Sequence, residues 1–323
     1  MSILRFGDRG QEVYMAQTAL VRAGAQIAVD GIFGRATEQA VRRFQSKNGL
    51  VPDGVVGPLT WRVLDMYMMG YIERRLVAGD TFYKLAEAYN TSVGAIALAN
   101  PSLDPLALPV GGTVRIPLPY DVTPLIPYSS RLTELVIEGL AARYPFITQA
   151  QYGRSVAGRR LVSVTVGRGQ TAVAYNASHH ANEWITTPLL LKFLEGYAEA
   201  YAAGSHIYNT PAEELFDRVT LTLAPLVNPD GVDLVTGAFD TASRLYRKAV
   251  RLADNYPAIP FPSGWKANIA GTDLNLNYPA GWEQAREIKF AGGFTLPGPR
   301  DYVGQAALSA PEARAMYDLT ERI

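Results

Sequence analysis

The sequence has no cysteine, and its 323 residues include only three histidines. The absence of cysteine excludes disulfide bonds and thiolate metal sites. Basic and acidic residues number 30 each, so no net field favours nucleic acid or an anionic membrane as a partner. No apolar run reaches the roughly 18 residues that a membrane-spanning helix needs. Residues 1–7 lack a charged segment followed by an apolar one, so we expect no secretory signal peptide.

The length suggests two or three domains, and an internal repeat marks the first of them. Asp30–Thr37, with the sequence DGIFGRAT, recurs as Asp53–Thr60, with the sequence DGVVGPLT. Each copy predicts a glycine-rich turn whose final threonine caps a following helix. Residues 38–47, between the copies, have the apolar spacing of a helix. Residues 1–68 resemble the small three-helix peptidoglycan-binding domain, and a generic helical bundle is the alternative.

Residues 73–118 have the pattern of a second small module. Val77–Phe82 precedes a predicted helix over 83–89, and a second short helix is predicted over 93–100. A returning strand is predicted within Val110–Pro117. This βααβ order resembles the LysM module, which implies a shallow groove for glycans that contain N-acetylglucosamine.

A proline-rich linker, residues 119–129, separates these modules from the rest of the chain. Beyond it, helical and strand patterns alternate, with helices over 130–144 and 186–203 and strands over 163–166, 172–177 and 218–226. The strand over 172–177 is β-branched and aromatic, which predicts that it is buried. The alternation indicates an α/β domain over 130–323, with a mixed central sheet covered on both faces.

The motif that carries chemistry is His180-Ala-Asn-Glu183, where the strand over 172–177 gives way to the helix. A histidine and a glutamate three residues apart at such a turn can both point toward one ion. Neutral imidazole and carboxylate are ligands that catalytic zinc prefers, with one position left open for water. A surface His–Glu pair is the alternative, because HxxE alone recurs by chance in long proteins.

Further motifs surround this one in a fixed order: GRSVAGRRL at Gly153–Leu161, NPDG at Asn228–Gly231, RLYRK at Arg244–Lys248, GTDLNLNY at Gly271–Tyr278, YVG at Tyr302–Gly304 and SAPE at Ser309–Glu312. Together with His180–Glu183, the series resembles the zinc carboxypeptidase family from about Tyr128 to the end of the chain. The resemblance implies a zinc metallopeptidase with Zn²⁺ as its cofactor.

By this resemblance, His180 and Glu183 are two of the three zinc ligands. Asp273 would bond the far nitrogen of His180 and fix its tautomer. Arg247 would polarise the scissile carbonyl and stabilise the oxyanion, a task that needs a permanent cation. Asn275 would help to hold the carboxylate of the substrate.

Leu276 departs from the family pattern, in which an arginine clamps the free C-terminal carboxylate of the substrate. A leucine side chain offers no hydrogen-bond donor. One interpretation is a neutral substitution. The other, which we favour, is that the enzyme does not require a free α-carboxylate at this place.

The third zinc ligand of the family is a second histidine, and its general base is a glutamate further along the chain. Here both are expected beyond Ile323, after a helix predicted over 311–323. His179 neighbours His180 and points the other way from an extended strand end. His206 lies past a helix of about 18 residues, on the order of 27 Å away, whereas a zinc–nitrogen bond is about 2 Å. We therefore expect a fragment that holds zinc poorly and lacks activity.

The predicted fold is multidomain: a three-helix bundle, a βααβ module and an α/β carboxypeptidase-like domain that is incomplete at its C-terminus. With Leu276, this combination resembles the bacterial γ-D-glutamyl-L-diamino acid endopeptidases, which cut peptidoglycan stem peptides and are associated with sporulating cells. It implies peptidoglycan glycans and stem peptides as partners, and a location in the cytoplasm or with the spore or cell wall. The alternatives are a broader zinc carboxypeptidase and a non-catalytic peptidoglycan-binding protein.

Overall fold

The computed structural model describes residues 3–123 and 126–323. Residues 1–2 of the predicted first domain and residues 124–125 of the predicted linker lie outside the described residues. The chain forms two compact units, one of residues 1–123, 134–148 and 195–207, the other of residues 124–133, 149–194 and 208–323. No helix in the described part of the chain is long and apolar enough to cross a bilayer.

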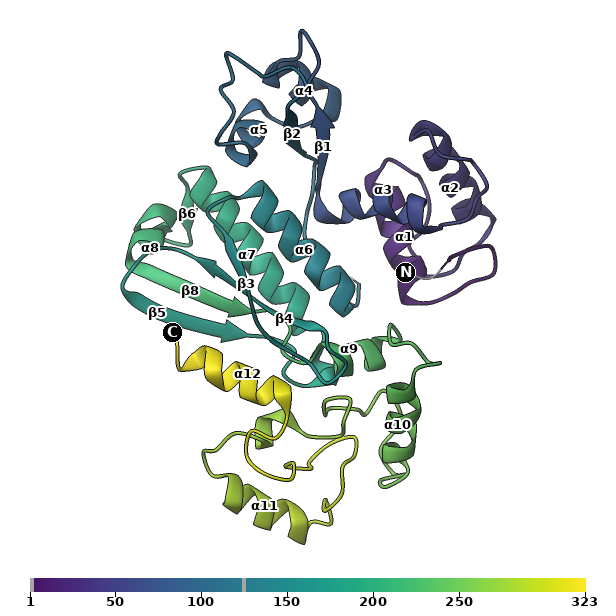
Figure 1. Ribbon diagram of the computed structural model, residues 1–323, viewed down its shortest axis with the longest axis vertical. Coiled ribbons are helices and arrows are strands. Elements are labelled where there is room, and N and C mark those ends of the chain that lie inside the picture. The colour runs from purple at the N-terminus through teal and green to yellow at the C-terminus, as the bar shows by residue number, and fades with distance from the viewer. Residues whose placement is uncertain (1–2, 124–125) are drawn as a thin grey trace. The chain divides into compact units, whose positions relative to one another are not determined.

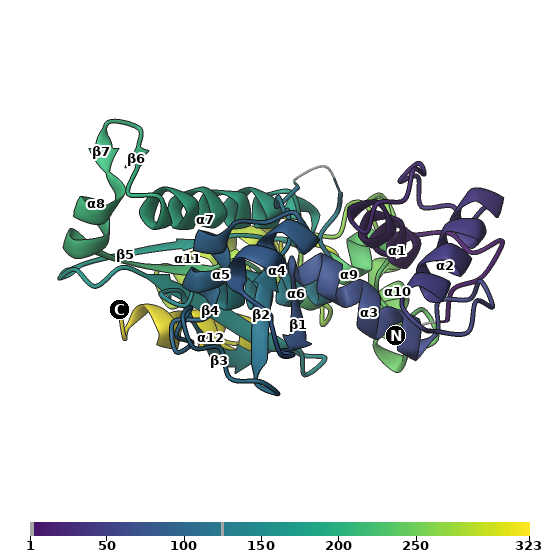
Figure 2. The same cartoon turned by 90° about the horizontal axis from the view of Figure 1, so that it is seen from above.

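The N-terminal part of the first unit is a bundle of the helices α1 (Gln11–Arg22), α2 (Arg35–Lys47) and α3 (Pro58–Met69), shown in Figures 1 and 2. The predicted helix between the two repeats is therefore confirmed. Phe33 and Trp61 are among the largest fully buried side chains of the bundle.

Two buried glutamines organise the repeated turns in the same way. Gln17 Nε2 donates to Asp30 Oδ1 at 2.8 Å and to Thr37 Oγ1 at 3.1 Å. Gln45 makes the same pair of bonds in the second copy, where Thr60 Oγ1 accepts at 3.1 Å. The prediction that the two threonines cap helices is therefore wrong. Each threonine lies in the first turn of its helix, and its hydroxyl oxygen accepts a hydrogen bond from the side-chain amide of a glutamine. A glycine occupies each N-cap instead.

The next part of the first unit is an antiparallel pair of strands, β1 (Tyr71–Arg75) and β2 (Thr113–Pro117), with α4 (Phe82–Tyr89) and α5 (Val93–Ala99) between them in the chain. Both helices pack against β2. Their shared core includes Leu85, Ile96, Val114 and Ile116. The side chains of Thr81 and Ser92 accept backbone N–H groups at the start of α4 and α5. The predicted βααβ order is confirmed.

The second unit contains a four-stranded sheet in the order β3–β4–β8–β5 (Figure 1). The strands are β3 (Thr148–Arg154), β4 (Arg160–Val166), β5 (Thr171–Asn176) and β8 (Val219–Ala224). Strand β8 is antiparallel to β4 and parallel to β5. Successive residues from Leu221 to Ala224 are all buried, so both faces of the sheet are covered at β8. The predicted mixed sheet is confirmed.

Strand β5 differs from the prediction of a buried strand. It is an edge of the sheet formed by the described residues, with β8 beside it, and five of its six residues are exposed. A strand with β-branched and aromatic residues suits an edge of a sheet as well as its centre, because this composition does not reveal how many neighbours the strand has.

Helices α6 (Ser130–Arg143) and α7 (Thr186–Ala202) match their predicted segments. Helix α12 (Pro311–Thr320) packs against the sheet, since Ala313 and Met316 share a hydrophobic cluster with Ala224 of β8, and Tyr152 of β3 packs against the same cluster. The other elements are η1 (Ala181–Glu183), β6 (His206–Ile207), β7 (Thr210–Pro211), α8 (Ala212–Arg218), α9 (Pro229–Thr236), α10 (Arg244–Ala253), η2 (Leu274–Leu276) and α11 (Trp282–Ala291).

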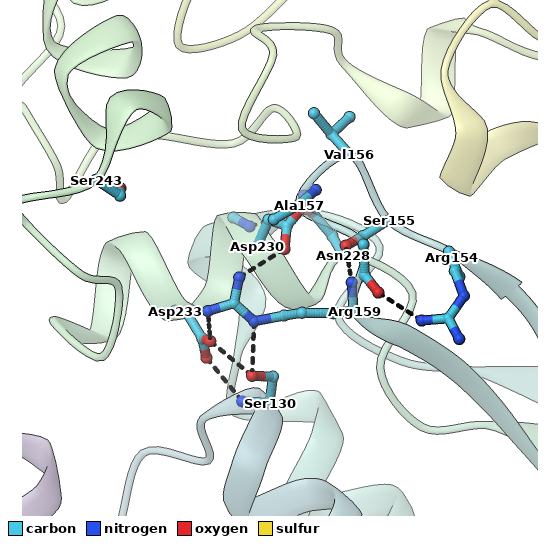
Figure 3. Close-up of polar contacts among 12 residues, drawn as sticks. Ser130, Arg154, Ser155, Val156, Ala157, Arg159, Asn228, Asp230, Asp233 and Ser243 are labelled. Atoms are coloured by element: carbon cyan, nitrogen blue, oxygen red, sulfur yellow. Dashed lines mark hydrogen bonds and ion pairs between the residues drawn. The ribbon is translucent and has the colours of Figure 1, made fainter. Parts of the chain in front are cut away.

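Buried carboxylates hold the loops of the second unit together (Figure 3). Arg159 pairs with Asp230 Oδ1 through Nη1 and with Asp233 Oδ2 through Nη2, both at 2.8 Å. Ser130 Oγ donates to Asp233 Oδ2 at 2.6 Å. The other oxygen of Asp230 accepts the N–H of Ala157 at 2.8 Å. The turn that contains Ala157 and Arg159 is thereby tied to helix α9.

Glu312, in the first turn of α12, is another buried carboxylate. Its Oε1 accepts the N–H of Val156 and its Oε2 accepts Nδ2–H of Asn268, both at 2.9 Å. Its side chain is fully buried, and burial raises the pKa of this carboxyl group to about 7. Asn268 in turn accepts the N–H of Thr272, next to Asp273. Glu312 thus connects α12 to the segment that leads into Asp273.

The raised pKa of Glu312 predicts that stability falls as the pH rises. In the unfolded chain this carboxyl ionises near its ordinary pKa of 4.5, whereas in the folded protein it stays protonated up to about pH 7. Its stabilising contribution is therefore complete below pH 4.5 and is lost as the pH rises through 7. From about pH 5 to about pH 8, the unfolding free energy of the wild type should fall by about 2 kcal/mol relative to Glu312→Gln.

Urea unfolding of the unit that contains Glu312, at both pH values, measures this change. Glu321→Gln is the matched control, because Glu321 is exposed just after the same helix. A difference between the wild type and Glu312→Gln that does not vary with pH would contradict the assignment.

Candidate functional site

The two candidate metal ligands lie on a short turn after β5. His180 is the N-cap residue of η1, which ends at Glu183. The turn before it is fixed by Ser178, whose φ is 46° and whose N–H donates to Thr186 Oγ1 at 2.8 Å. On the other side, the N–H of Ala181 donates to the carbonyl of Lys266 at 3.0 Å. Bonds on both sides therefore position η1.

Close packing behind η1 explains the glycine of the NPDG motif. Ala181 is fully buried in a cluster that includes Trp265 and Ala267. A Cβ atom on Gly231 would lie 2.7 Å from Cβ of Ala181, so a larger residue would push α9 away from η1. Asn228 accepts the N–H of Gly231 at 3.0 Å and donates to the carbonyl of Ala267 at 3.0 Å. The NPDG motif therefore allows α9 to pack closely against η1, the turn that contains His180 and Glu183.

The imidazole ring of His180 lies between two carboxylates. Nδ1 is 2.9 Å from Glu183 Oε1, and Nε2 is 3.3 Å from Asp273 Oδ1 without the alignment of a hydrogen bond. Nδ1 and the Glu183 oxygen therefore meet on one side of the ring, while Asp273 faces the far nitrogen. Burial disfavours the imidazolium, but Asp273 and Glu183 outweigh it and raise the pKa of His180.

Asp273 is itself buried and held by several groups. Lys266 Nζ lies 3.6 Å from Oδ2, and the N–H of Asp301 donates to the same oxygen at 3.2 Å. Burial alone would raise the pKa of Asp273, but the nearby His180 ring and the charge of Lys266 lower it. Asp273 is therefore an anion that can orient His180. Lys266 lies in none of the predicted motifs, so its contact with Asp273 was not predicted from the sequence.

His179 makes structural contacts away from the ligand pair. Its Nδ1 lies 3.2 Å from Asn176 Oδ1, and its Nε2 lies 2.9 Å from Tyr278 OH. Because an amide oxygen only accepts, this arrangement places the proton on Nδ1 and leaves Nε2 to accept from the tyrosine. Burial, with the charge of His180, lowers the pKa of His179 to about 4, which keeps the ring neutral. The third histidine, His206, is exposed on β6.

The remaining predicted site residues lie on α10 and η2. Arg247 is exposed, and its guanidinium donates to the carbonyl of Ala242. Among the described residues it makes no hydrogen bond or ion pair with His180, whose ring lies instead beside Glu183 and Asp273. Asn275 is exposed and Leu276 is half-buried, both in η2 directly after Asp273.

Asn277, rather than Asn275, is the buried asparagine of the Asn-x-Asn segment. Its Nδ2 donates to the carbonyls of Val303 and Ala306 at 2.8 and 2.9 Å, and its Oδ1 accepts the N–H of Ala310 at 2.9 Å. It therefore holds the loop that precedes α12. The sequence contained this residue in a motif, but nothing in the motif distinguished the buried asparagine from the exposed one.

The donor set fits part of a catalytic zinc site. Such sites use three protein ligands, and histidine nitrogen and carboxylate oxygen are among the types that zinc accepts. His180 and Glu183 offer one side chain of each of these two types, 2.9 Å apart. Within residues 3–123 and 126–323, no group of three or more His, Cys, Asp or Glu side chains is arranged to hold a metal ion. The described residues therefore fit two of the three ligand positions.

Comparisons with known proteins identify three regions. The zinc carboxypeptidase family matches residues 133–323, the putative peptidoglycan binding domain matches 9–64, and the LysM domain matches 75–117. The Gamma-D-glutamyl-L-diamino acid endopeptidase 1 of Lysinibacillus sphaericus is 42% identical over 184 residues, which cover 57% of this chain and 45% of that protein. The zinc D-Ala-D-Ala carboxypeptidase of Streptomyces albus G is 47% identical over 58 residues, 17% of this chain and 23% of that protein.

Among solved structures, bovine thrombin-activatable fibrinolysis inhibitor in complex with tick carboxypeptidase inhibitor is similar, with a TM-score of 0.43 and 22% identity. The similarity covers 60% of this chain and 56% of that one. The chain spans about half the length of the first curated relatives it matches. Because the zinc carboxypeptidase match extends over more than half of the chain, the protein belongs to the zinc carboxypeptidase family.

Proposed function

We propose that this protein hydrolyses the γ-D-glutamyl-L-diamino acid bond of peptidoglycan stem peptides while its N-terminal modules bind the cell wall. The matches to a peptidoglycan binding domain and a LysM domain support the association with the wall. The relative that is 42% identical is named for this bond. We assign residues 1–68 and 73–118 to wall binding and residues 130–323 to catalysis.

The observation that carries the choice of bond is Leu276. It follows Asp273 and Asn275 in η2, half-buried, at the place where carboxypeptidases of the family carry an arginine. Leucine cannot clamp a carboxylate, so a free C-terminus next to the scissile bond gains nothing here. A bond inside a stem peptide needs no such clamp.

The side chains support metal-assisted hydrolysis. We assign His180 and Glu183 as ligands for zinc, which when bound supplies Lewis-acid activation of a carbonyl and of water. Asp273 holds the His180 ring so that Nδ1 faces Glu183. Arg247, exposed on α10, is the permanent cation available to stabilise an oxyanion, which requires that its guanidinium turn toward the substrate. We assign Asn275 to a carboxylate of the substrate.

Replacement of Leu276 tests the proposed specificity in the full-length protein. Wild type should cleave a γ-D-glutamyl-L-diamino acid peptide whether its C-terminal carboxylate is free or amidated, and should spare the α-linked isomer. Leu276→Arg should raise the kcat/KM ratio of free to amidated substrate by roughly tenfold or more, because a guanidinium forms a charge-assisted bond with the carboxylate.

Leu276→Met is the matched control, since it keeps an apolar side chain of similar size, and its ratio should equal that of the wild type. A wild type that cleaves only substrates with a free C-terminus would instead support a broader carboxypeptidase. A zinc-loaded full-length protein that cleaves neither would support a non-catalytic wall binder.

Zinc binding tests the ligand assignment directly. The 323-residue polypeptide should bind zinc weakly and release it to a mild chelator, because the described residues provide two of the three ligands that a catalytic site uses. His180→Ala and Glu183→Gln should each weaken binding further, as measured by calorimetric titration. His206→Ala, which removes an exposed histidine, should have no effect. Retention of one zinc ion per chain after chelation would show that another side chain completes the site.

A further inference from the structure

The two repeats of the N-terminal bundle differ in one respect. Gln17 lies 13 residues before Asp30, whereas Gln45 lies only 8 residues before Asp53, although both glutamines bind their turns in the same way. The extra residues of the first copy extend α1 beyond Gln17 and lengthen the connection that follows it. The two copies therefore share the contact between the glutamine and its turn. They differ in the segment between the glutamine and the aspartate, which is longer in the first copy.

The enlarged segment lines a cavity. The space has a volume of about 360 Å³ and lies between the end of α1, the connection over 23–27 and one side of α2 (helices labelled in Figures 1 and 2). Leu20, Ala40 and Phe44 are buried and form an apolar floor. Cavities of a few hundred Å³ with an apolar lining and a few polar groups are typical of sites for small ligands.

The polar rim of the cavity is cationic. Arg43 and Lys47 lie one helical turn apart on α2, both exposed, and no acidic residue lines the cavity. In the described part of the chain, neither forms an ion pair, whereas the adjacent Arg42 is paired with Glu38 at 2.9 Å. Two unneutralised cations above an apolar floor favour a ligand with carboxylates and a small apolar group.

We propose that this cavity binds the peptide stem of peptidoglycan by contacting the carboxylates of the stem. The N-terminal bundle therefore recognises the peptide rather than the glycan. The inference rests on the proposed wall association. In a γ-linked glutamyl residue the α-carboxylate stays free, so the stem carries an anion within its chain as well as at its end. Arg43 and Lys47 bind these carboxylates, and the floor formed by Leu20, Ala40 and Phe44 receives an adjacent apolar side chain.

The test uses the full chain, labelled with ¹⁵N and treated with EDTA so that zinc-dependent hydrolysis cannot consume the probe. The probe is the tripeptide L-alanyl-γ-D-glutamyl-L-lysine, followed by NMR. Binding should shift the amide signals of Gly24, Ala25 and Gln26, and the dicarboxamide analogue should not. The variant Arg43→Gln/Lys47→Gln should raise Kd at least about tenfold, because each lost cation removes a charge-assisted bond.

Arg35→Gln/Arg62→Gln is the matched control, with the same loss of charge at exposed positions outside the cavity lining, and its Kd should equal that of the wild type. Arg43→Lys/Lys47→Arg should bind nearly normally. The proposal is overturned if the tripeptide leaves these signals unmoved, if the dicarboxamide binds equally well, or if chitotetraose shifts them instead.

Sedimentation with insoluble peptidoglycan separates this proposal from the proposed function. A wild-type chain that stays in the supernatant would refute the wall association itself. A chain that sediments normally in both the wild type and Arg43→Gln/Lys47→Gln, with an unchanged Kd for the tripeptide, would refute only the assignment of the cavity.

Discussion

The second unit depends on carboxyl groups that have no access to water. Asp230, Asp273 and Glu312 are fully buried, and a buried carboxyl group, ionised or protonated, is tolerated only where charges or hydrogen bonds compensate its lost hydration. Each one therefore requires partners from other segments. Asp230 pairs with Arg159 in the turn after β3. Glu312 of α12 accepts a hydrogen bond from Asn268. Asp273 lies beside both His180 and Lys266. These pairings determine how loops far apart in the sequence are arranged around η1.

This arrangement fixes the position of η1, the turn that contains His180 and Glu183. Ala181 packs against Gly231 and bonds to the backbone of Lys266, so His180 and Glu183 stand on a turn fixed from two sides. Sites built on supported elements hold their geometry better than sites on free loops. Leu276, the proposed specificity residue, lies in the same short segment as Asp273, whose carboxylate faces His180.

The N-terminal bundle shows how two copies of one repeat can share a turn and differ in the segment beside it. The glutamine–turn contacts set the fold of both copies, so the residues between them are free to differ in length. In the first copy the additional residues open a cavity beside Arg43 and Lys47. The same unit contains the βααβ module, whose core is separate and apolar. In the function proposed above, tethering through two small modules raises the local concentration of substrate bonds for residues 130–323.

The sequence by itself determined the order of the domains, the main helices and strands and the position of His180 and Glu183 at a strand end, because these follow from local periodicity and short motifs. Burial of β5 and capping by Thr37 and Thr60 were predicted wrongly, because neighbouring strands and the reach of Gln17 and Gln45 are not local properties. Only the tertiary structure decided that Lys266 pairs with Asp273 and that Glu312 accepts from Val156, 156 residues away. Buried polar groups pair with whichever donors the fold brings near them. Because these donors can lie anywhere in the sequence, no local pattern predicts which residues will pair.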